Sequence, residues 1–511
     1  MAEAALGAAP IDDGPDALAT VRLLAARGSH AALGELVDAP EPLARRRLSD
    51  VAWLKRLGEC FCGDPGFRAD FLAAPERAAR ARGLRVAPED LNAFHAAQGG
   101  SDEDDPRARW TENMHALWEL TRAGLDCEGW NAAAQSGARP GGEHYRRWRA
   151  RCRARERYDF PPHVAGFYRP VVAVELASGC SVGCWFCAIS ADGLRATAEL
   201  GAAERAEWHA VVDVLERTLG ASSAAAICYW ATDPLDNPSY ESFLEAFHAR
   251  TGAWPPTVTA LAARQPERVA RILARAARHG CLSNELSVLS VADLRRLHAA
   301  FRPEDLLFTP LVLQGRGAHQ FVAYPRAVPA RKVLAGRVRE AAARGNAMAR
   351  EAQPGSIACV VGFLLNLVER RVRLIRPCTA DARWPLGYVV LDEARYADAP
   401  ELEARITAMT SRWMSAELPD DRVIGFDHGL EFRVLPNGFE LRGAWQTRRF
   451  VDRLRLPGRP SWLAIGVLVN AGDASASTIA RRLAAGGIDA AAVSEALGVL
   501  YDAGVLALDA R

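Results

Sequence analysis

The sequence predicts a mixed α/β fold: a partial, open (β/α)6 barrel, with a helical domain before it and a small winged-helix-like domain after it. In the middle of the chain, short apolar runs alternate with amphipathic helical patterns, which is typical of parallel strands joined by helical crossovers. On both sides of this region the alternation gives way to helical periodicity. We expect a helical region at 1–160, the barrel at 161–400, a linking helix at 401–427 and the winged-helix-like domain at 428–511.

The composition is that of an ordinary globular protein of more than one domain. The 511 residues are 50% hydrophobic and 24% charged, and the net charge of +1 gives no bulk attraction to nucleic acid or to an anionic membrane. The amino terminus lacks the basic residues of a signal peptide, and the longest apolar run, 357–368, is shorter than the ~20 residues that cross a bilayer. We therefore expect a cytoplasmic protein whose 11 cysteines form no disulfide framework.

Helical periodicity dominates the amino-terminal region. Apolar residues recur at three- and four-residue steps over 42–61, and 64–84 predicts two short helices separated by Pro75. The segment 98–109 is polar and acidic, which favours a linker, and one more helix is expected over 110–124.

Six apolar runs are the expected strands of the barrel. They are 171–176, 224–230, 257–261, 285–290, 306–313 and 357–365. Helical patterns at 204–219 and 265–280 lie between them. In parallel β/α barrels the active site lies at the carboxyl ends of the strands. Functional residues are therefore expected directly after these runs.

Three cysteines follow the first expected strand: Cys180, Cys184 and Cys187, with the spacing C-x3-C-x2-C. Three thiolates on one loop can ligate three irons of a [4Fe–4S] cluster and leave the fourth iron open to S-adenosylmethionine (SAM). The cluster can then pass one electron to the sulfonium and release a 5′-deoxyadenosyl radical. A zinc site or buried structural cysteines are the alternatives. Trp185 and Phe186, which precede the third cysteine, are candidate cofactor contacts.

The second expected strand ends in YWATDPLDN (229–237). Thr232 and Asp233 are candidates for binding the amino group of SAM; alternatively, Asp233 caps the following helix. Asp236 and Asn237 can be capping or turn residues. Hydroxyl residues on later strands are weaker candidates for contacts with ribose or substrate, and an ordinary strand role explains each of them equally well: Thr257, Thr259, Ser287 and Ser290.

The strings GCSVGCWFCAIS (179–190) and YWATDPLDNPSYESF (229–243) together resemble the radical SAM peptide epimerases of proteusin (polytheonamide-type) maturation. Further similar stretches are DPGFRADF (64–71), PPTVTA (255–260), ELSVLS (285–290) and GFLLNLVERRVRLIRPC with RWPLGY (362–388). The resemblance spans most of the chain and is strongest from 165 to 390. It implies a radical SAM barrel and an enzyme that converts L-residues to D-residues in a ribosomally made precursor peptide.

The resemblance also implies a hydrogen donor. The deoxyadenosyl radical would abstract a Cα hydrogen, and a hydrogen atom must then arrive from the opposite face, a task that suits the weak S–H bond of cysteine. Cys378 matches the family's RPC position and is the candidate donor; the alternative is an ordinary loop thiol. Cys228 and Cys359 lie inside apolar runs and are expected in the core, and Cys281 follows a helix on the far side from the chemistry.

The carboxyl-terminal region predicts a hairpin over 430–444 with Asn437 and Gly438 as its turn, followed by three helices. It looks like the domain that binds leader peptides in many ribosomal-peptide maturases, where a leader strand would extend its sheet; a generic helical cap is the alternative. The expected partners are thus a precursor peptide with a leader and an external one-electron reductant of flavodoxin or ferredoxin type.

Two other functions fit the same residues. The first keeps the radical chemistry but forms a cross-link or a carbon–carbon bond in the peptide, with loss of two hydrogens per link. The second is a non-catalytic scaffold that binds the leader and carries a vestigial cluster.

Overall fold

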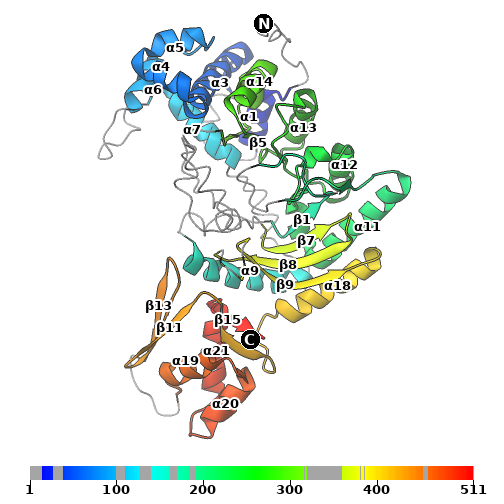
Figure 1. Cartoon of the computed structure of the whole chain (residues 1–511), viewed down its shortest axis with the longest axis vertical. Helices are drawn as coiled ribbons and strands as arrows, with labels where there is room; N and C mark the ends of the chain where they lie inside the picture. Colours follow the sequence, from blue (N-terminus) through cyan, green and yellow to red (C-terminus); the bar gives the residue numbers. More distant parts are fainter. Residues whose placement is uncertain are drawn as a thin grey trace.

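The chain adopts a mixed α/β fold in which helices surround several small sheets (Figure 1). The structure, a computed structural model, describes residues 14–26, 38–98, 110–125, 140–160, 170–184, 191–315, 317–318, 360–379, 381, 383–384, 386–452 and 459–509. Within these ranges no helix has both the length and the apolar character that crossing a membrane requires.

The amino-terminal part is helical. Its helices are α1 (Ala17–Ala26), α3 (Glu41–Gly63), α4 (Pro65–Ala73), α5 (Pro75–Ala81), α6 (Pro88–Ala97), α7 (Glu112–Leu125) and α9 (Pro140–Asp159). A proline begins each of α4, α5 and α6, a position where its missing N–H costs nothing. Asp64 ends α3 and accepts two hydrogen bonds from the first turn of α4. The helices expected over 42–61, 64–84 and 110–124 are confirmed; the linker at 98–109 lies outside the described residues except for Gln98.

The middle of the chain contains two sheets of three or more strands, besides one pair of very short strands. The first has the order β1-β7-β8-β9, formed by β1 (Val172–Glu175), β7 (Gly362–Asn366), β8 (Arg371–Pro377) and β9 (Tyr388–Arg395). The second is parallel and has the order β4-β5-β6, formed by β4 (Val258–Thr259), β5 (Glu285–Val288) and β6 (Leu311–Leu313). The connecting helices are α11 (Ala202–Leu219), α12 (Tyr240–Thr251), α13 (Pro266–Arg278) and α14 (Val291–Ala300), and α18 (Ala399–Trp413) follows β9.

The pairing differs in part from a row of six parallel strands. The second expected strand, 224–230, makes only a parallel bridge between Ile227 and Ala173 of β1. The strand expected to be sixth, β7, pairs in parallel with β1, on the side away from that bridge, and β8 and β9 then run antiparallel. Gly362 permits this close approach, since at its φ of +146° an added Cβ would lie 2.1 Å from the carbonyl oxygen of Val171. These two sheets are therefore open, and the described residues contain no closed barrel.

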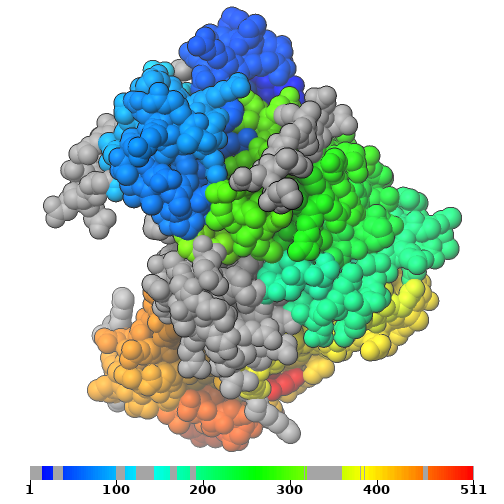
Figure 2. Space-filling model, turned by 45° about the horizontal axis from the view of Figure 1, so that its top comes forward, coloured from blue at the N-terminus to red at the C-terminus, as the bar shows by residue number. Residues whose placement is uncertain are grey.

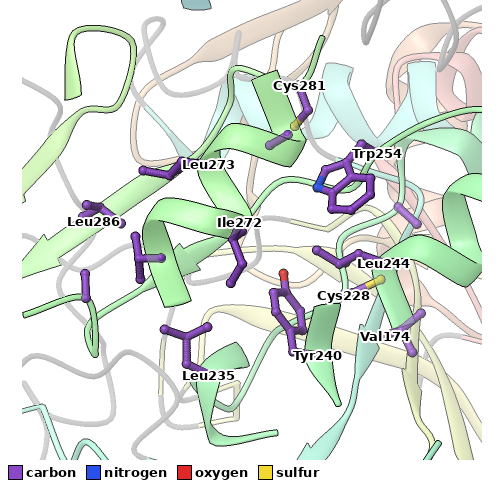
Figure 3. Packing of buried hydrophobic residues seen from close by; sticks show 14 of the residues in the cluster. Val174, Cys228, Leu235, Tyr240, Leu244, Trp254, Ile272, Leu273, Cys281 and Leu286 are labelled. Atoms are coloured by element: carbon purple, nitrogen blue, oxygen red, sulfur yellow. The ribbon is translucent and has the colours of Figure 1, made fainter. Parts of the chain in front are cut away.

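The two faces of the β1-β7-β8-β9 sheet have different neighbours. Alternate residues such as Val174 and Phe363 belong to the main core, which the helices cover, whereas Ala173 and Leu364 belong to a second, smaller cluster on the other face. We call this second face the inner face. Figure 3 shows the main core beside β1, where Cys228 packs near Val174, Leu244 and Tyr240. Cys228 is fully buried, as expected.

The carboxyl-terminal module contains two three-stranded sheets and three helices. One sheet has the order β14-β10-β15, formed by β10 (Val423–Phe426), β14 (Ala474–Ser475) and β15 (Leu506–Leu508). The other has the order β11-β12-β13, formed by β11 (Glu431–Leu435), β12 (Gly438–Arg442) and β13 (Thr447–Val451), and the helices are α19 (Trp462–Ala471), α20 (Ala476–Ala484) and α21 (Ala490–Asp502). Because β10 pairs with β15, the module begins within the segment expected to be a linking helix.

The expected hairpin is confirmed, but its turn was placed one residue too late. Leu435 pairs with Gly438, so the turn residues are Pro436 and Asn437. Gly438 instead begins β12, where an added Cβ would lie 2.0 Å from the carbonyl oxygen of Phe450 in β13. The glycine thus serves strand pairing instead of the turn.

A buried ion cluster joins the module to the rest of the molecule. Asp427, at the end of β10, accepts hydrogen bonds from Arg376 of β8 at 2.6 Å and from Arg155 of α9 at 3.0 Å. Arg155 also contacts Asp159 at 2.8 Å. Burial alone would raise the pKa of Asp427, but the two arginines hold it below its usual range. Figure 2 shows the module (orange to red) at one end of the molecule and the amino-terminal helices (blue) at the other.

At that other end a second polar cluster attaches α3 to α14. Glu59 pairs with Lys55 and accepts a hydrogen bond from His298 Nε2 at 2.9 Å, and Cys60 Sγ lies 3.6 Å from His298 Nδ1. Burial would raise the pKa of Glu59, but the opposing charges and hydrogen bonds hold it at about 2. Burial lowers the pKa of His298, so Lys55 is the main counter-charge at neutral pH.

Glu59→Gln should destabilise the amino-terminal helices at pH 7. Because the pKa of Glu59 is depressed from 4.5 to about 2 in the folded protein, its contribution is complete above about pH 4.5 and lost as pH falls through about 2. The depression corresponds to about 3 kcal/mol. Thermal unfolding of wild type and variant should therefore differ at pH 7 and converge toward pH 2. As a control, Glu76→Gln breaks an exposed pair with Arg80 and should cost under about 0.5 kcal/mol; an equal loss in both variants would contradict the prediction.

Candidate metal and cofactor site

The loop that carries the cysteines leaves β1 at its carboxyl end and is tied at its base. The short strands β2 (Ala177–Ser178) and β3 (Ala196–Thr197) pair antiparallel and bring the two ends of the loop together. Gly179 has a φ of +84°, and an added Cβ would lie 2.2 Å from the carbonyl oxygen of Gly193. Only glycine permits this crossing without moving the backbone.

Cys180 and Cys184 differ from the other described cysteines in exposure. Both are partly exposed, whereas the following are buried: Cys60, Cys62, Cys152, Cys228, Cys281 and Cys378. Burial raises the pKa of the Cys180 thiol, which lies within hydrogen-bond reach of the backbone N–H of Asp233. Accessible thiols on a glycine-supported loop, beside a backbone donor, fit the ligation of an iron–sulfur cluster. Trp185, Phe186 and Cys187 lie outside the described residues.

The 229–237 turn lies directly beside this loop. The carboxylate of Asp233 accepts hydrogen bonds from Thr259 Oγ1 and the N–H of Ala260, both at 2.7 Å, and from the N–H of Leu235 at 3.0 Å. Asp233 therefore caps the short helix after it, one of the two expected roles, and also joins the turn to the end of β4. Burial raises its pKa to about 6. The neighbouring Thr232 is buried, and its hydroxyl donates to the carbonyl of Asp233 at 3.3 Å.

Asp236 and Asn237 connect the turn to the cysteine loop. The carboxylate of Asp236 accepts from the N–H and the hydroxyl of Ser181 at 2.9 and 2.5 Å. The side-chain amide of Asn237 donates to the carbonyls of Leu176 and Ala198, both at 2.9 Å. The structure thus brings together Cys180 and the turn that carries Thr232 and Asp233, as the sequence predicted for neighbouring strand ends.

A buried polar group on the inner face lies next to this turn and was missed in the sequence. Glu175, the last residue of β1, accepts from Asn366 Nδ2 at 2.8 Å and from the N–H of Ala231 at 3.3 Å, and Arg373 of β8 lies 4.0 Å away. Tyr388 of β9 is a further neighbour of Arg373. Burial raises the pKa of Glu175. The signal available was a carboxylate inside an otherwise apolar strand, which is costly unless it has partners.

Cys378 lies at the opposite edge of the sheet from the cysteine loop. It follows β8, which runs antiparallel to β7, so it lies beyond the amino-terminal ends of β7 and β1. Along β7, Asn366 lies four residues from Gly362. Gly362 pairs with Ile375 of β8, and Cys378 lies three residues beyond Ile375. At ~3.3 Å per residue these steps span roughly 20 Å. Arg376 and Asp427 are close neighbours of its thiol. The described arrangement therefore does not bring Cys378 to Cys180.

Cys281, which precedes β5, also lies on this amino-terminal side of the strands, and Cys359 falls outside the described residues.

Comparison with known proteins gives one informative relative. No protein-family model matches the chain, and no solved structure matches it. A Sinorhizobium fredii (strain NBRC 101917 / NGR234) protein, "Uncharacterized protein y4wI", is 30% identical over 486 residues, which cover 92% of this chain and 89% of that protein. Identity at this level over nearly the full length of both chains shows common descent. The chain belongs to the same family as y4wI of Sinorhizobium fredii.

Proposed function

We propose that the protein is a radical SAM enzyme that epimerises L-residues to D-residues in a ribosomally made precursor peptide. The observation that carries the proposal is the contact between the Cys180–Cys184 loop and the 229–237 turn at the carboxyl end of β1. Active sites of parallel β/α folds lie at this edge. The parallel strands β1 and β7 and the sheet β4-β5-β6 are compatible with an opened radical SAM barrel.

In this proposal Cys180, Cys184 and Cys187 hold a [4Fe–4S] cluster. Such a cluster would supply the one-electron reducing chemistry of a radical SAM enzyme. Asp233 keeps the turn rigid through its three hydrogen bonds, and the turn, together with Thr232, then presents fixed groups to the amino end of SAM. Trp185 and Phe186, which lie outside the described residues, remain the proposed cofactor contacts, and the proposed electron source is an external reductant of flavodoxin or ferredoxin type.

The inner face provides groups suited to a peptide. Glu175 and Arg373 lie together beside the turn, and Arg373 keeps a partly exposed guanidinium whose nearest carboxylates, on Glu175 and Glu393, are 4.0 and 3.9 Å away. Such a loosely paired guanidinium can exchange its partners for the carbonyl groups of a peptide main chain. We assign substrate orientation to Arg373, with the buried Glu175 as the group that positions it.

The carboxyl-terminal module fits the binding of a leader peptide. In the β11-β12-β13 sheet, β11 and β13 are edge strands, whose unpaired backbone groups can accept an added strand. Val434 on β11 is 60% exposed, and Trp445, before β13, is 59% exposed, so this sheet also offers apolar contacts to such a strand. The buried Asp427 cluster would hold a bound leader at a fixed distance from β8.

Cys378 is the proposed hydrogen donor: its S–H bond breaks as the Cα–H bond forms, and one electron from the external reductant with a proton from solvent returns the resulting thiyl radical to the thiol. Burial raises the pKa of its thiol to about 12, so it keeps at neutral pH the S–H bond that donation needs. Because roughly 20 Å separates it from the cysteine loop along the strands, this role requires the segment that carries it to move toward the inner face when the peptide binds. The cross-linking and scaffold functions remain the alternatives.

The protein should bind a cluster through the loop thiols. Anaerobic reconstitution should give about four irons per chain in the wild type, and Cys184→Ala should lose most of them because the ligand set becomes incomplete. Cys281→Ala is the matched control: it removes a buried thiol at the other end of the strands and should leave the iron content unchanged. Equal iron in all three proteins, or none in the wild type, would rule out the proposed site.

Turnover of the cognate precursor in D2O tests the reaction. Each epimerised residue should gain one deuterium at Cα with no other change in mass, because the abstracted hydrogen is replaced by one that has exchanged with solvent. The measurement is mass spectrometry with chiral analysis of the hydrolysed peptide. Products two hydrogens lighter per link would indicate the cross-linking alternative, and absence of SAM cleavage would indicate a scaffold.

Cys378→Ala should separate radical formation from stereochemical inversion. SAM cleavage should persist, because the cluster and the turn are intact, while deuterium incorporation falls at least about 100-fold, in the usual range for loss of a group that transfers hydrogen. Cys281→Ala should retain both. Normal deuterium incorporation by Cys378→Ala would assign the donor role to another group.

A further inference from the structure

We propose that Asn237 is a positioning residue that fixes the cysteine loop against the 229–237 turn, which we call the SAM-side turn. Asp236 is a second point of attachment. The inference rests on the proposed function, because it concerns how the chain holds the three thiols. It adds a residue for which the sequence suggested only a capping or turn role.

Asn237 spans the base of the loop. Leu176 is the residue before the loop-closing strand β2, and Ala198 is the residue after β3. The amide of Asn237 donates one N–H to the carbonyl of each, and its Oδ1 accepts from the N–H of Ser239 at 2.7 Å. Only one orientation of the amide satisfies all three neighbours. A flipped amide would place its oxygen against the two carbonyls, where it could accept no hydrogen bond.

Burial makes these contacts hard to replace. Asn237 is 1% exposed and its bond to the carbonyl of Leu176 is buried, whereas its bond to the carbonyl of Ala198 is partly exposed, so loss of the amide is costly mainly at Leu176. Leu176 and Ala198 are also bonded to each other, through the N–H of Ala198 at 2.8 Å. Asn237 thus completes a closed ring of polar contacts where the chain enters and leaves the cysteine loop.

The same turn contacts the loop again nearer the thiols. Asp236, the preceding residue, binds the N–H and hydroxyl of Ser181, which is the neighbour of Cys180. Adjacent residues of one turn therefore fix the loop at its base and beside its first thiol. Any shift at Asn237 would change the position of Cys180 relative to the SAM-side turn.

A matched pair of buried asparagines allows a test. Asn284 is 4% exposed and also bonds only backbone groups, accepting from the N–H of Thr257 at 2.9 Å and donating to the carbonyl of Cys281 at 3.1 Å. It lies at the amino-terminal ends of β4 and β5, away from the cysteine loop. Asn237→Ser and Asn284→Ser should lower the midpoint of thermal unfolding to a similar degree, since each removes a comparable set of buried bonds.

Only Asn237→Ser should affect the cluster. In the anaerobically reconstituted full-length protein, iron should be lost to a chelator about tenfold faster than from the wild type or from Asn284→Ser, in the range found for groups that orient metal ligands. The electron paramagnetic resonance spectrum of the reduced cluster with SAM should also change shape. Iron loss and a spectrum equal to those of Asn284→Ser would reduce Asn237 to a structural residue and overturn the inference.

Two further results keep the outcomes separate. A wild-type protein that binds no iron would contradict the proposed function itself, whereas an iron-loaded wild type with an unaffected Asn237→Ser contradicts this inference alone. If Asn237→Ser does not fold, Ser181→Ala, an exposed position, removes the hydroxyl bond to Asp236 without touching the core. A changed spectrum in Ser181→Ala supports the role of the turn in placing the loop, and an unchanged one contradicts it.

Discussion

The ion pairs of the buried Asp427 carboxylate hold helix α9, strand β8 and the carboxyl-terminal module together. The arrangement of these three parts depends on them. The carboxylate binds a guanidinium from α9 and another from β8, while its own backbone belongs to the carboxyl-terminal module. Burying one carboxylate between two arginines is tolerable only because the charges compensate, and loss of one partner in such a cluster typically costs about 3–5 kcal/mol. Helix α9 extends this connection, since it packs on α11 and α18 at the sheet and on α21 in the module. The module and the sheet are therefore held in one orientation.

Within the sheet, the alternation of side chains decides where chemistry can occur. One face of β1 packs into the helical core, and the inner face collects Glu175, Asn366 and Arg373 at the carboxyl edge. The cysteine loop and the 229–237 turn lie at this same edge. Charged and hydrogen-bonding groups are thus concentrated at one end of the inner face, beside the loop, and apolar residues such as Ala173 and Leu364 fill the rest.

Local features could be predicted from the sequence, and non-local pairing could not. The amino-terminal helices, the 430–444 hairpin and the strands β4 and β5 depend on residues close together in the chain and were found where their patterns indicated. The run 306–313 forms a strand, β6, only at its end, because its first residue lies in a short 3-10 helix. The pairing of β7 with β1 joins residues almost 200 positions apart, and the periodicity of apolar residues does not predict which strands pair. In the site, adjacency of the loop and the turn followed from strand order, but the bonds that occupy Asp233 and the placement of Cys378 depend on tertiary contacts. Glu175 was missed because an apolar run conceals a single paired carboxylate.

The pairing of β1 with β7 also has a consequence for biosynthesis. The cysteine loop leaves the ribosome well before its supporting sheet is complete. Cys184 and Asn366 are 182 positions apart (366 minus 184), and until β7 is made β1 lacks the strand that pairs with it in parallel. At about 5–20 residues per second this interval is roughly 10–40 s. During it the thiols are exposed to oxidation and to stray metal ions on an unfinished scaffold. Under the proposed function, iron and sulfide would therefore have to reach the completed chain, with the nascent loop protected until then.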